Sequence, residues 1–175
     1  MKVIISMSGL SSRFSDVGYT IPKFMIDIDG KKVIEHIINV YPKDSDFLFI
    51  INDKHAEDTD IVNLLENSVN KKNILVIPRH KKGPVFSIQN FENYINDEEQ
   101  VVINYCDFSM YWDYKDFEKY VNDTDCDGCV VCYTGFHPHM LGSDNYAFCR
   151  TDSPKELQIR EIREKQPFTN DKMSE

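Results

Sequence analysis

The sequence lacks the long apolar segments that membrane insertion or secretion requires. No stretch of its 175 residues approaches the length of about eighteen apolar residues that a membrane-spanning helix needs. The apolar run near the start, Val3-Ile4-Ile5, is only as long as a strand and is followed by Ser6, so it does not resemble a signal peptide. We therefore expect a cytoplasmic protein with no membrane partner.

Positive charge is also scarce. The chain has 20 Lys and Arg against 29 Asp and Glu, which gives a formal net charge of −9. A protein with this balance does not present a broad surface for nucleic acid or anionic lipid, so we expect no nucleic-acid partner. A nucleotide site remains compatible with this charge, because it needs only a local cluster of basic groups.

The five cysteines do not form an obvious set of pairs. Their number is odd and no secretory signal is present, so reduced thiols are expected. Three of them have the spacing Cys126-x-x-Cys129-x-x-Cys132, which is also found in some metal sites. However, the segment Cys129–Tyr133 is typical of a strand, along which positions three apart point to opposite faces. Buried strand thiols are therefore our interpretation.

Apolar segments that alternate with helical periodicity indicate the fold class. Strands are predicted at Val3–Ser6, Phe47–Ile51, Ile74–Ile77 and Val101–Asn104. Helices are predicted between them, at Lys32–Val40, Asp60–Val69 and Val85–Tyr94. This rhythm implies right-handed crossovers and a mostly parallel, Rossmann-like α/β sheet with helices on both faces. The length fits one domain over residues 1–175.

The pattern changes after Asp107. A helix is predicted at Tyr114–Tyr120, and extended segments are predicted at Cys129–Tyr133, Tyr146–Arg150 and Leu157–Ile162. Two further features have plain interpretations. His137-Pro138-His139 is expected to hold ordinary surface histidines, and Trp112 is expected to pack in the interior or to form a wall of a pocket.

The most informative segment follows the first predicted strand. A loop of mostly small residues begins there, and it consists of Ser8, Gly9, Leu10, Ser11 and Ser12. Arg13 follows at once, and Lys23 follows Arg13 by ten residues. Small residues let backbone N–H groups approach phosphate oxygens, and the two cations add positive charge. Because ligands of open parallel sheets bind beyond the carboxyl ends of the strands, this segment predicts a triphosphate site.

This segment resembles the signature of the nucleotidyltransferases that make sugar nucleotides and related activated alcohols. In that family a strand leads into a G-x-G-[ST]-R loop and a Pro-Lys pair follows, as Pro22-Lys23 does here. Ser11 stands where the second glycine is usual. The resemblance extends to Gly83 before a helix, to Asp107 after a strand and to Lys165 in a Glu-Lys pair, all in the family's order.

The resemblance implies a reaction and a role for each of these residues. An acceptor phosphate would attack the α-phosphorus of a nucleoside triphosphate, and pyrophosphate would leave. Lys23 would neutralise the α-phosphate, Arg13 would hold the β- and γ-phosphates, and Asp107 would hold Mg²⁺. Gly83 would lie close to the base, the loop from Ser8 to Ser12 would bind the nucleotide, and Lys165 would face the acceptor's phosphate.

The nucleotide and the acceptor are less closely specified. We favour CTP, because the segment Arg79–Lys82 lacks the glutamine that thymidylyl enzymes of the family place near the base. The acceptor is expected to be a phosphate monoester, and the product would serve the synthesis of surface or capsular polysaccharide precursors. Transfer to a sugar 1-phosphate from UTP or dTTP is the alternative within the family, and a homo-oligomer is compatible with both.

Each site residue also has a structural interpretation. Arg13 and Lys23 could be solvated surface charges, and Asp107 could cap the following helix. Lys165 could belong to a solvated charged face, and Gly83 could be a turn residue.

Two other functions remain open. One is a non-catalytic nucleotide-binding regulatory domain. The other is a glycosyltransferase, whose D-x-D metal motif Asp125-Cys126-Asp127 matches as a string but precedes a predicted strand instead of ending one.

The family's fold continues beyond the Glu-Lys segment. That continuation supplies another strand and a second aspartate for the magnesium site. We therefore expect this sequence to be a form that lacks its C-terminal part, with the nucleotide half of the site intact and the metal site incomplete.

Overall fold

The computed structural model describes residues 1–89, 93–96, 98–133, 146–153 and 157–170. The chain divides into two compact units, Met1–Tyr120 and Val121–Glu175, which are considered separately here. A single domain over the whole chain remains a prediction. Within the described residues, no helix has both the length and the apolar character needed to cross a membrane.

A four-stranded parallel sheet forms the centre of the first unit. Its strands are β1 (Lys2–Met7), β4 (Asp46–Asn52), β5 (Lys71–Ile77) and β6 (Val101–Tyr105), in the order β5-β4-β1-β6. Every neighbouring pair is parallel, with Val3 opposite Phe47 on one side and Val102 on the other. Each of the four predicted strands lies within one of these strands, so the predicted α/β fold with a parallel sheet is confirmed.

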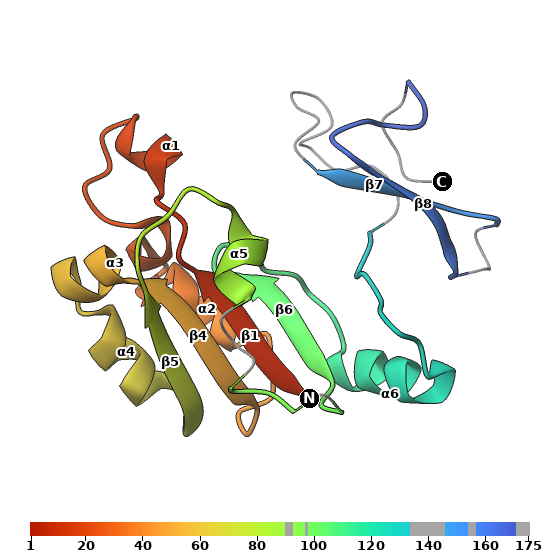
Figure 1. The fold of residues 1–175 in the computed structure, drawn as a ribbon, viewed down its shortest axis with the longest axis horizontal. Coiled ribbons are helices and arrows are strands. Elements are labelled where there is room, and N and C mark those ends of the chain that lie inside the picture. The colour runs from red at the N-terminus through yellow and green to blue at the C-terminus, as the bar shows by residue number, and fades with distance from the viewer. Residues whose placement is uncertain (90–92, 97, 134–145, 154–156, 171–175) are drawn as a thin grey trace. The chain divides into compact units, whose positions relative to one another are not determined.

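Helices cover both faces of this sheet (Figure 1). Helices α2 (Val33–Ile38) and α4 (Ile61–Ser68) pack on one face. The buried side chains of that layer are Val3, Ile5, Phe47, Phe49, Ile34, Ile37, Ile61 and Leu65. On the opposite face, Ile4, Leu48 and Ile50 pack against Ile88 of helix α5 (Pro84–Ile88). Successive residues of β1 and β4 therefore alternate between two apolar layers, as the pleat of a strand requires.

Several short elements connect the main ones. Between β1 and α2 lie α1 (Ser12–Ser15), the 3₁₀ helix η1 (Lys23–Met25) and the hairpin of β2 (Asp27–Ile28) and β3 (Lys31–Lys32). Helix α3 (Asp53–Asp58) follows β4 directly. The sequence pattern did not predict α1 or α3. Helix α5 ends at Ile88, earlier than its predicted end, and residues 90–92 lie outside the described part of the chain.

The second unit has less regular structure. Helix α6 (Tyr114–Thr124) begins in the first unit and continues into the second, where β7 (Ala147–Thr151) and β8 (Ile159–Glu164) form an antiparallel pair. The prediction of a strand at Cys129–Tyr133 is wrong, because these described residues pair with no described strand.

The prediction of buried thiols along that segment is wrong for the same reason. Without a ladder to place alternate side chains against a core, Cys129 and Cys132 are exposed. The pair His137 and His139 lies outside the described residues.

Candidate active site

The carboxyl ends of four parallel strands meet at one edge of the sheet, and the candidate site lies there. Ser8 follows β1, Asn52 ends β4, and Arg79 and Asp107 come shortly after β5 and β6. Helices α1 and α5 lie at the same edge (Figure 1). In open α/β sheets this edge is the usual place for ligands.

An ion pair joins Lys23 and Asp107, which were predicted as site residues from two different motifs. The Nζ of Lys23 lies 2.7 Å from Oδ2 of Asp107, and both side chains are partly exposed, at 24% and 41%. Asp107 does not cap the following helix. That helix begins at Tyr114, and the Oδ1 of Asp113 accepts hydrogen bonds from the N–H groups of Lys115 and Asp116.

Ser11 connects the loop to the turn that carries Lys23. It adopts the left-handed conformation, with φ 53° and ψ 25°, which glycine occupies without strain. Its hydroxyl accepts a hydrogen bond from the backbone N–H of Lys23 at 3.3 Å, which a glycine could not do. Compared with a glycine, the serine at this position therefore has a more strained backbone but adds a hydrogen bond between two parts of the site.

Ser8 is held from both sides. Its buried hydroxyl is hydrogen-bonded to the hydroxyl of Ser87 in α5, which in turn contacts Nε2 of His80 at 3.0 Å. On the other side, Nδ2 of Asn52 donates to the carbonyl oxygen of Ser8 at 3.0 Å. Sequence reasoning missed these supporting residues. The one available signal was a polar side chain, Asn52, at the end of an apolar strand.

Gly83 is the N-cap of α5, and its backbone conformation requires glycine. Its φ of 88° and ψ of 171° lie in a region that is essentially restricted to glycine. No heavy atom lies within 4 Å of the position that a Cβ would take, so the requirement comes from the backbone and not from crowding. Pro84 at the first position of the helix fixes the direction of α5.

Arg13 and Lys165 occupy different units. Arg13 is exposed in α1, directly after the loop. Lys165 follows β8 in the second unit, where its N–H donates to the carbonyl of Tyr146 and its Nζ lies 3.7 Å from Glu164. A role for Lys165 toward an acceptor phosphate remains a prediction.

A cavity of about 290 Å³ lies beside the loop. Its lining comes from three segments: the loop and the chain up to Pro22, helix α3 with the residue that follows it, and Arg79 after β5. Leu10 and Ser11 face it from the loop, and His55 faces it from α3. The lining includes the basic side chains of Lys54 and Arg79 together with hydroxyl and apolar side chains.

Burial shifts the pKa of two groups near the site. The pKa of His55 is lowered from its ordinary value, chiefly because burial disfavours the charged ring. Burial raises the pKa of the Cys106 thiol, next to Asp107, to about 12. Cys106 is therefore a neutral, buried side chain at physiological pH and not a nucleophile.

The residues near Asp107 fit a magnesium ion that is held jointly by one carboxylate and the phosphates of a substrate. Across the described parts of the chain, no three His, Cys, Asp or Glu side chains are grouped so as to hold a metal ion. Mg²⁺ is commonly held by one or two carboxylates together with the phosphates of a substrate. The partly exposed carboxylate of Asp107 fits that arrangement and does not fit an all-protein cage.

Two other predictions concern residues outside this edge. Trp112 donates from Nε1 to the carbonyl of Val40 and packs against the rings of Tyr41, Tyr114 and Phe117, so its packing role is confirmed. Asp125-Cys126-Asp127 lies just after the end of α6. It therefore does not end a strand, where glycosyltransferases carry their metal motif.

Comparisons with known proteins agree on the fold. No protein-family model matches the sequence, and no curated protein matches it. Solved structures do match. A nucleoside-diphosphate-sugar pyrophosphorylase from Vibrio cholerae RC9 superimposes with a TM-score of 0.73 at 19% identity, over 98% of this chain and 69% of its own.

Two further structures resemble the chain to a similar degree. A protein assigned as a glucose-1-phosphate thymidylyltransferase from Bacillus anthracis, in complex with sucrose, gives a TM-score of 0.75 at 18% identity, over 95% of this chain and 65% of its own. A UDP-glucose pyrophosphorylase complexed with UDP-glucose gives 0.69 at 19% identity, over 94% and 69%.

This chain thus spans about two thirds of the length of these structures. At such identities the likeness is one of architecture. The chain has the fold found in these sugar-nucleotide pyrophosphorylases.

Proposed function

We propose that the protein transfers a nucleoside monophosphate from a nucleoside triphosphate to a phosphate monoester, with release of pyrophosphate. One observation carries this proposal. Lys23 and Asp107, which come from motifs 84 residues apart, form an ion pair beside the small-residue loop at the ligand-binding edge of the sheet. The fold shared with solved sugar-nucleotide pyrophosphorylases supports the same conclusion.

Different site residues would bind different phosphate groups of the substrates. Backbone N–H groups of the loop and the guanidinium of Arg13 would bind the β- and γ-phosphates, and Lys23 would bind the α-phosphate. The acceptor phosphate is already an anion, so the reaction needs no general base. Orientation of two polyanions and neutralisation of their charge are what the protein must supply.

The Lys23–Asp107 ion pair describes the site before substrate binds. A phosphate oxygen would take the place of the carboxylate on Lys23, and this exchange would free Asp107. A magnesium ion held by Asp107 and the phosphates would neutralise further negative charge. Before substrate binds, the ion pair therefore keeps the Lys23 ammonium and the Asp107 carboxylate adjacent, and each neutralises the other's charge.

The donor base and the acceptor remain part of the proposal. CTP is favoured by the absence of glutamine from Arg79–Lys82. A sugar 1-phosphate with UTP or dTTP is the second candidate, and it is favoured by the solved structures, which are named for UDP-glucose and glucose-1-phosphate. In either case the acceptor is a phosphate monoester.

Pyrophosphate release tests this function directly. The full chain is incubated with Mg²⁺, each of CTP, UTP, dTTP, ATP and GTP, and either glucose 1-phosphate or phosphocholine. We expect release with one pyrimidine triphosphate, and a rate about 10²–10³-fold lower for Lys23→Ala, as when one donor to a developing charge is lost. Asp107→Ala should also lose activity.

The matched control is Lys31→Ala, which removes an exposed lysine of the β2–β3 hairpin. Its rate should equal that of the wild type. Triphosphate binding without pyrophosphate release would instead support a non-catalytic nucleotide-binding domain. Equal rates for Lys23→Ala and the wild type would contradict the proposed site.

A further inference from the structure

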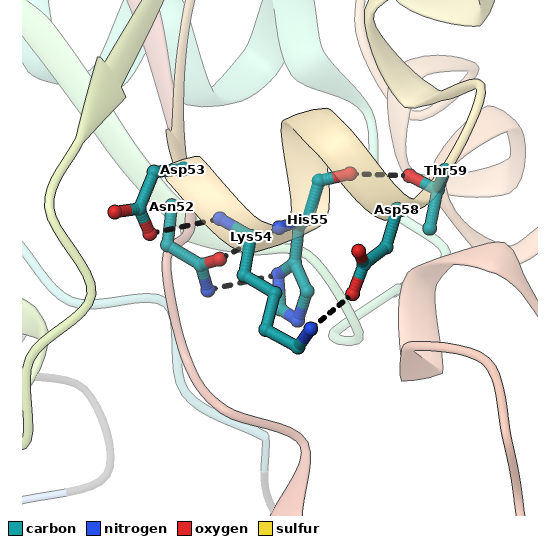
Figure 2. Close-up of polar contacts among 6 residues, drawn as sticks. All are labelled: Asn52, Asp53, Lys54, His55, Asp58 and Thr59. Carbon is teal, nitrogen blue, oxygen red and sulfur yellow. Dashed lines mark hydrogen bonds and ion pairs between the residues drawn. The ribbon is translucent and has the colours of Figure 1, made fainter.

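A buried polar pair lies directly beneath the loop. Asn52 is fully buried and His55 is 8% exposed. The Oδ1 of Asn52 accepts the backbone N–H of His55 at 2.8 Å, and its Nδ2 lies 3.0 Å from the ring Nδ1 of His55 (Figure 2). The same Nδ2 donates to the carbonyl of Ser8 at 3.0 Å. Nothing in the function proposed above uses these two side chains.

The hydrogen bonds fix the protonation state of the ring. Because Oδ1 of Asn52 is taken by a backbone N–H, the Nδ2 group faces the ring and must donate to it. Nδ1 of His55 must therefore be the unprotonated acceptor, and the ring must be neutral. A proton on Nδ1 would place two donors against each other.

Helix α3 holds this pair in place although it has only six residues. Asn52 caps its first turn. Lys54 and Asp58 form an ion pair at 2.6 Å, and Thr59 donates to the carbonyl of His55 at 2.6 Å (Figure 2). His55 is thereby held by hydrogen bonds at its backbone N–H, at its backbone carbonyl and at the ring Nδ1.

The pair contacts both segments that carry the proposed phosphate ligands. Asn52 holds Ser8 at the start of the loop through its hydrogen bond to the Ser8 carbonyl, and the backbone N–H of His55 is bonded to the same asparagine. The His55 ring packs edge-to-face on Phe24, with 5.1 Å between the ring centroids. Phe24 is buried and directly follows Lys23. The loop and the Lys23 turn therefore rest on one buried support.

Peptide geometry links this support to the ligand. The C=O of Ser8 and the N–H of Gly9 belong to one planar trans peptide and point in opposite directions. The hydrogen bond from Asn52 to the Ser8 carbonyl therefore turns the Gly9 N–H away from Asn52, toward the open side of the loop. A backbone N–H that is fixed before an anion arrives costs no reorganisation when it binds.

We propose that Asn52 and neutral His55 are positioning residues that hold the Ser8–Arg13 loop and the Lys23 turn in the conformation that accepts a triphosphate. This inference rests on the proposed function. In this role neither residue needs to contact the phosphates. They act through the Ser8 carbonyl and through the Phe24 ring.

The proposal implies a dependence on pH. Protonation of His55 breaks its contact with Asn52, and it would loosen the loop and the Lys23 turn together. The charged groups that act on the ring are Asp58, which favours its protonation, and Arg79 and Lys54, which oppose it. Acid should therefore weaken triphosphate binding beyond the effect of protonating the ligand itself.

The first arm of the test needs no variant. Nitrogen NMR of the ligand-free wild type at pH 7.5 should show Nδ1 of His55 as unprotonated and Nε2 as protonated. A protonated Nδ1 would overturn the proposal, because Asn52 could not then donate to the ring.

The second arm measures calorimetric binding of the Mg²⁺ complex of whichever triphosphate binds the wild type. Asn52→Asp replaces both donated hydrogen bonds with a carboxylate that faces the Ser8 carbonyl. Its dissociation constant should rise about tenfold or more, the equivalent of roughly one lost hydrogen bond. Asn70→Asp adds the same charge at the opposite edge of the sheet, before β5, and should bind as the wild type does. Amide NMR spectra establish that each variant is folded.

His55→Gln provides the conservative rescue. Its amide offers an acceptor and a donor that do not titrate but lacks the ring that packs on Phe24, so at pH 7.5 its affinity should lie between those of Asn52→Asp and the wild type. As the pH falls from 6.5 toward the lowered pKa of His55 in the folded protein, wild-type affinity should fall relative to His55→Gln. Protonation of the triphosphate affects both proteins equally and cancels in the ratio.

The outcomes separate the two proposals. If the wild type binds and Asn52→Asp binds equally well, or if the ratio to His55→Gln is independent of pH, the positioning role is overturned and the proposed function stands. If the wild type binds no triphosphate at all, the proposed function is overturned, and the positioning role with it.

Discussion

Ser11 shows how one side chain can serve two parts of a site at once. Its left-handed backbone costs an L-residue about 1–2 kcal/mol relative to glycine. Its hydroxyl recovers part of that cost by accepting the N–H of Lys23. A comparison of two substitutions can separate these opposing effects.

We expect Ser11→Ala to keep the backbone strain and lose the hydrogen bond, which lowers the free energy of unfolding by about 0.5–1.5 kcal/mol. Ser11→Gly loses the same bond but relieves the strain, and it should be more stable than Ser11→Ala by about 1 kcal/mol. Urea unfolding of the three proteins measures both differences. An alanine variant as stable as the glycine variant would contradict the strained conformation.

At the residue scale, motif order predicted the charged groups better than their supports. Lys23 and Asp107 could be placed in one site because each follows a strand-like segment or a recognisable loop. The supports Asn52, His55 and Ser87 could not, because a buried polar side chain is recognisable only when its hydrogen-bond partners are known. Several of those partners are distant in sequence, as Ser8 and Ser87 are, although Asn52 and His55 lie only three residues apart.

At the scale of elements, α4 illustrates what holds the first unit together. Its apolar positions Ile61 and Leu65 lie four residues apart on one face and are fully buried against the sheet. The opposite positions are exposed. Most of the stability of a helix this short comes from that packed face.

Leu65→Ala should therefore lower the free energy of unfolding by about 2–5 kcal/mol, through lost burial and the cavity left behind. Glu66→Ala changes the next residue, which is exposed, and should stay within about 0.5 kcal/mol of the wild type. Chemical denaturation followed by circular dichroism measures both. Equal losses for the two variants would show that α4 is not packed as described.

Elements were predictable where local pattern and packing agree. The strands β1 and β4 have a continuous apolar run at their centres, which suits strands that are covered on both faces. Cys129–Tyr133 has a similarly strand-like composition but pairs with no described strand, so composition alone misled the prediction there. Helix α3 was missed because its sequence, Asp53–Asp58, has no apolar stripe and depends on its cap and side-chain contacts.

At the scale of the whole molecule, one buried histidine should make stability depend on pH. The unfolded chain binds a proton at His55 with a pKa of about 6.5, whereas the folded protein holds the ring neutral to lower pH. Below pH 6.5 the unfolded state therefore binds more protons, and stability falls as the pH decreases toward the folded pKa. Above pH 6.5 this contribution is fully retained.

The difference in the free energy of unfolding between the wild type and His55→Gln isolates this effect from other titrating groups. This difference should be constant above about pH 7. As the pH falls below 6.5, the wild type should lose free energy of unfolding relative to His55→Gln. Urea titrations at several pH values between 5 and 8 measure it. A difference that does not vary with pH would mean that the ring is not held in its neutral form.

The central claim is that the edge of the sheet around Lys23 binds the triphosphate of a nucleotide. The most direct test is calorimetric titration of the wild type, Lys23→Ala and Lys31→Ala with the Mg²⁺ complexes of the pyrimidine triphosphates. We predict that at least one binds the wild type and Lys31→Ala equally, and that Lys23→Ala weakens it by about 10–100-fold, as expected for a lost charge-assisted hydrogen bond. Equal affinity for Lys23→Ala and the wild type, or no binding to the wild type, would contradict the claim.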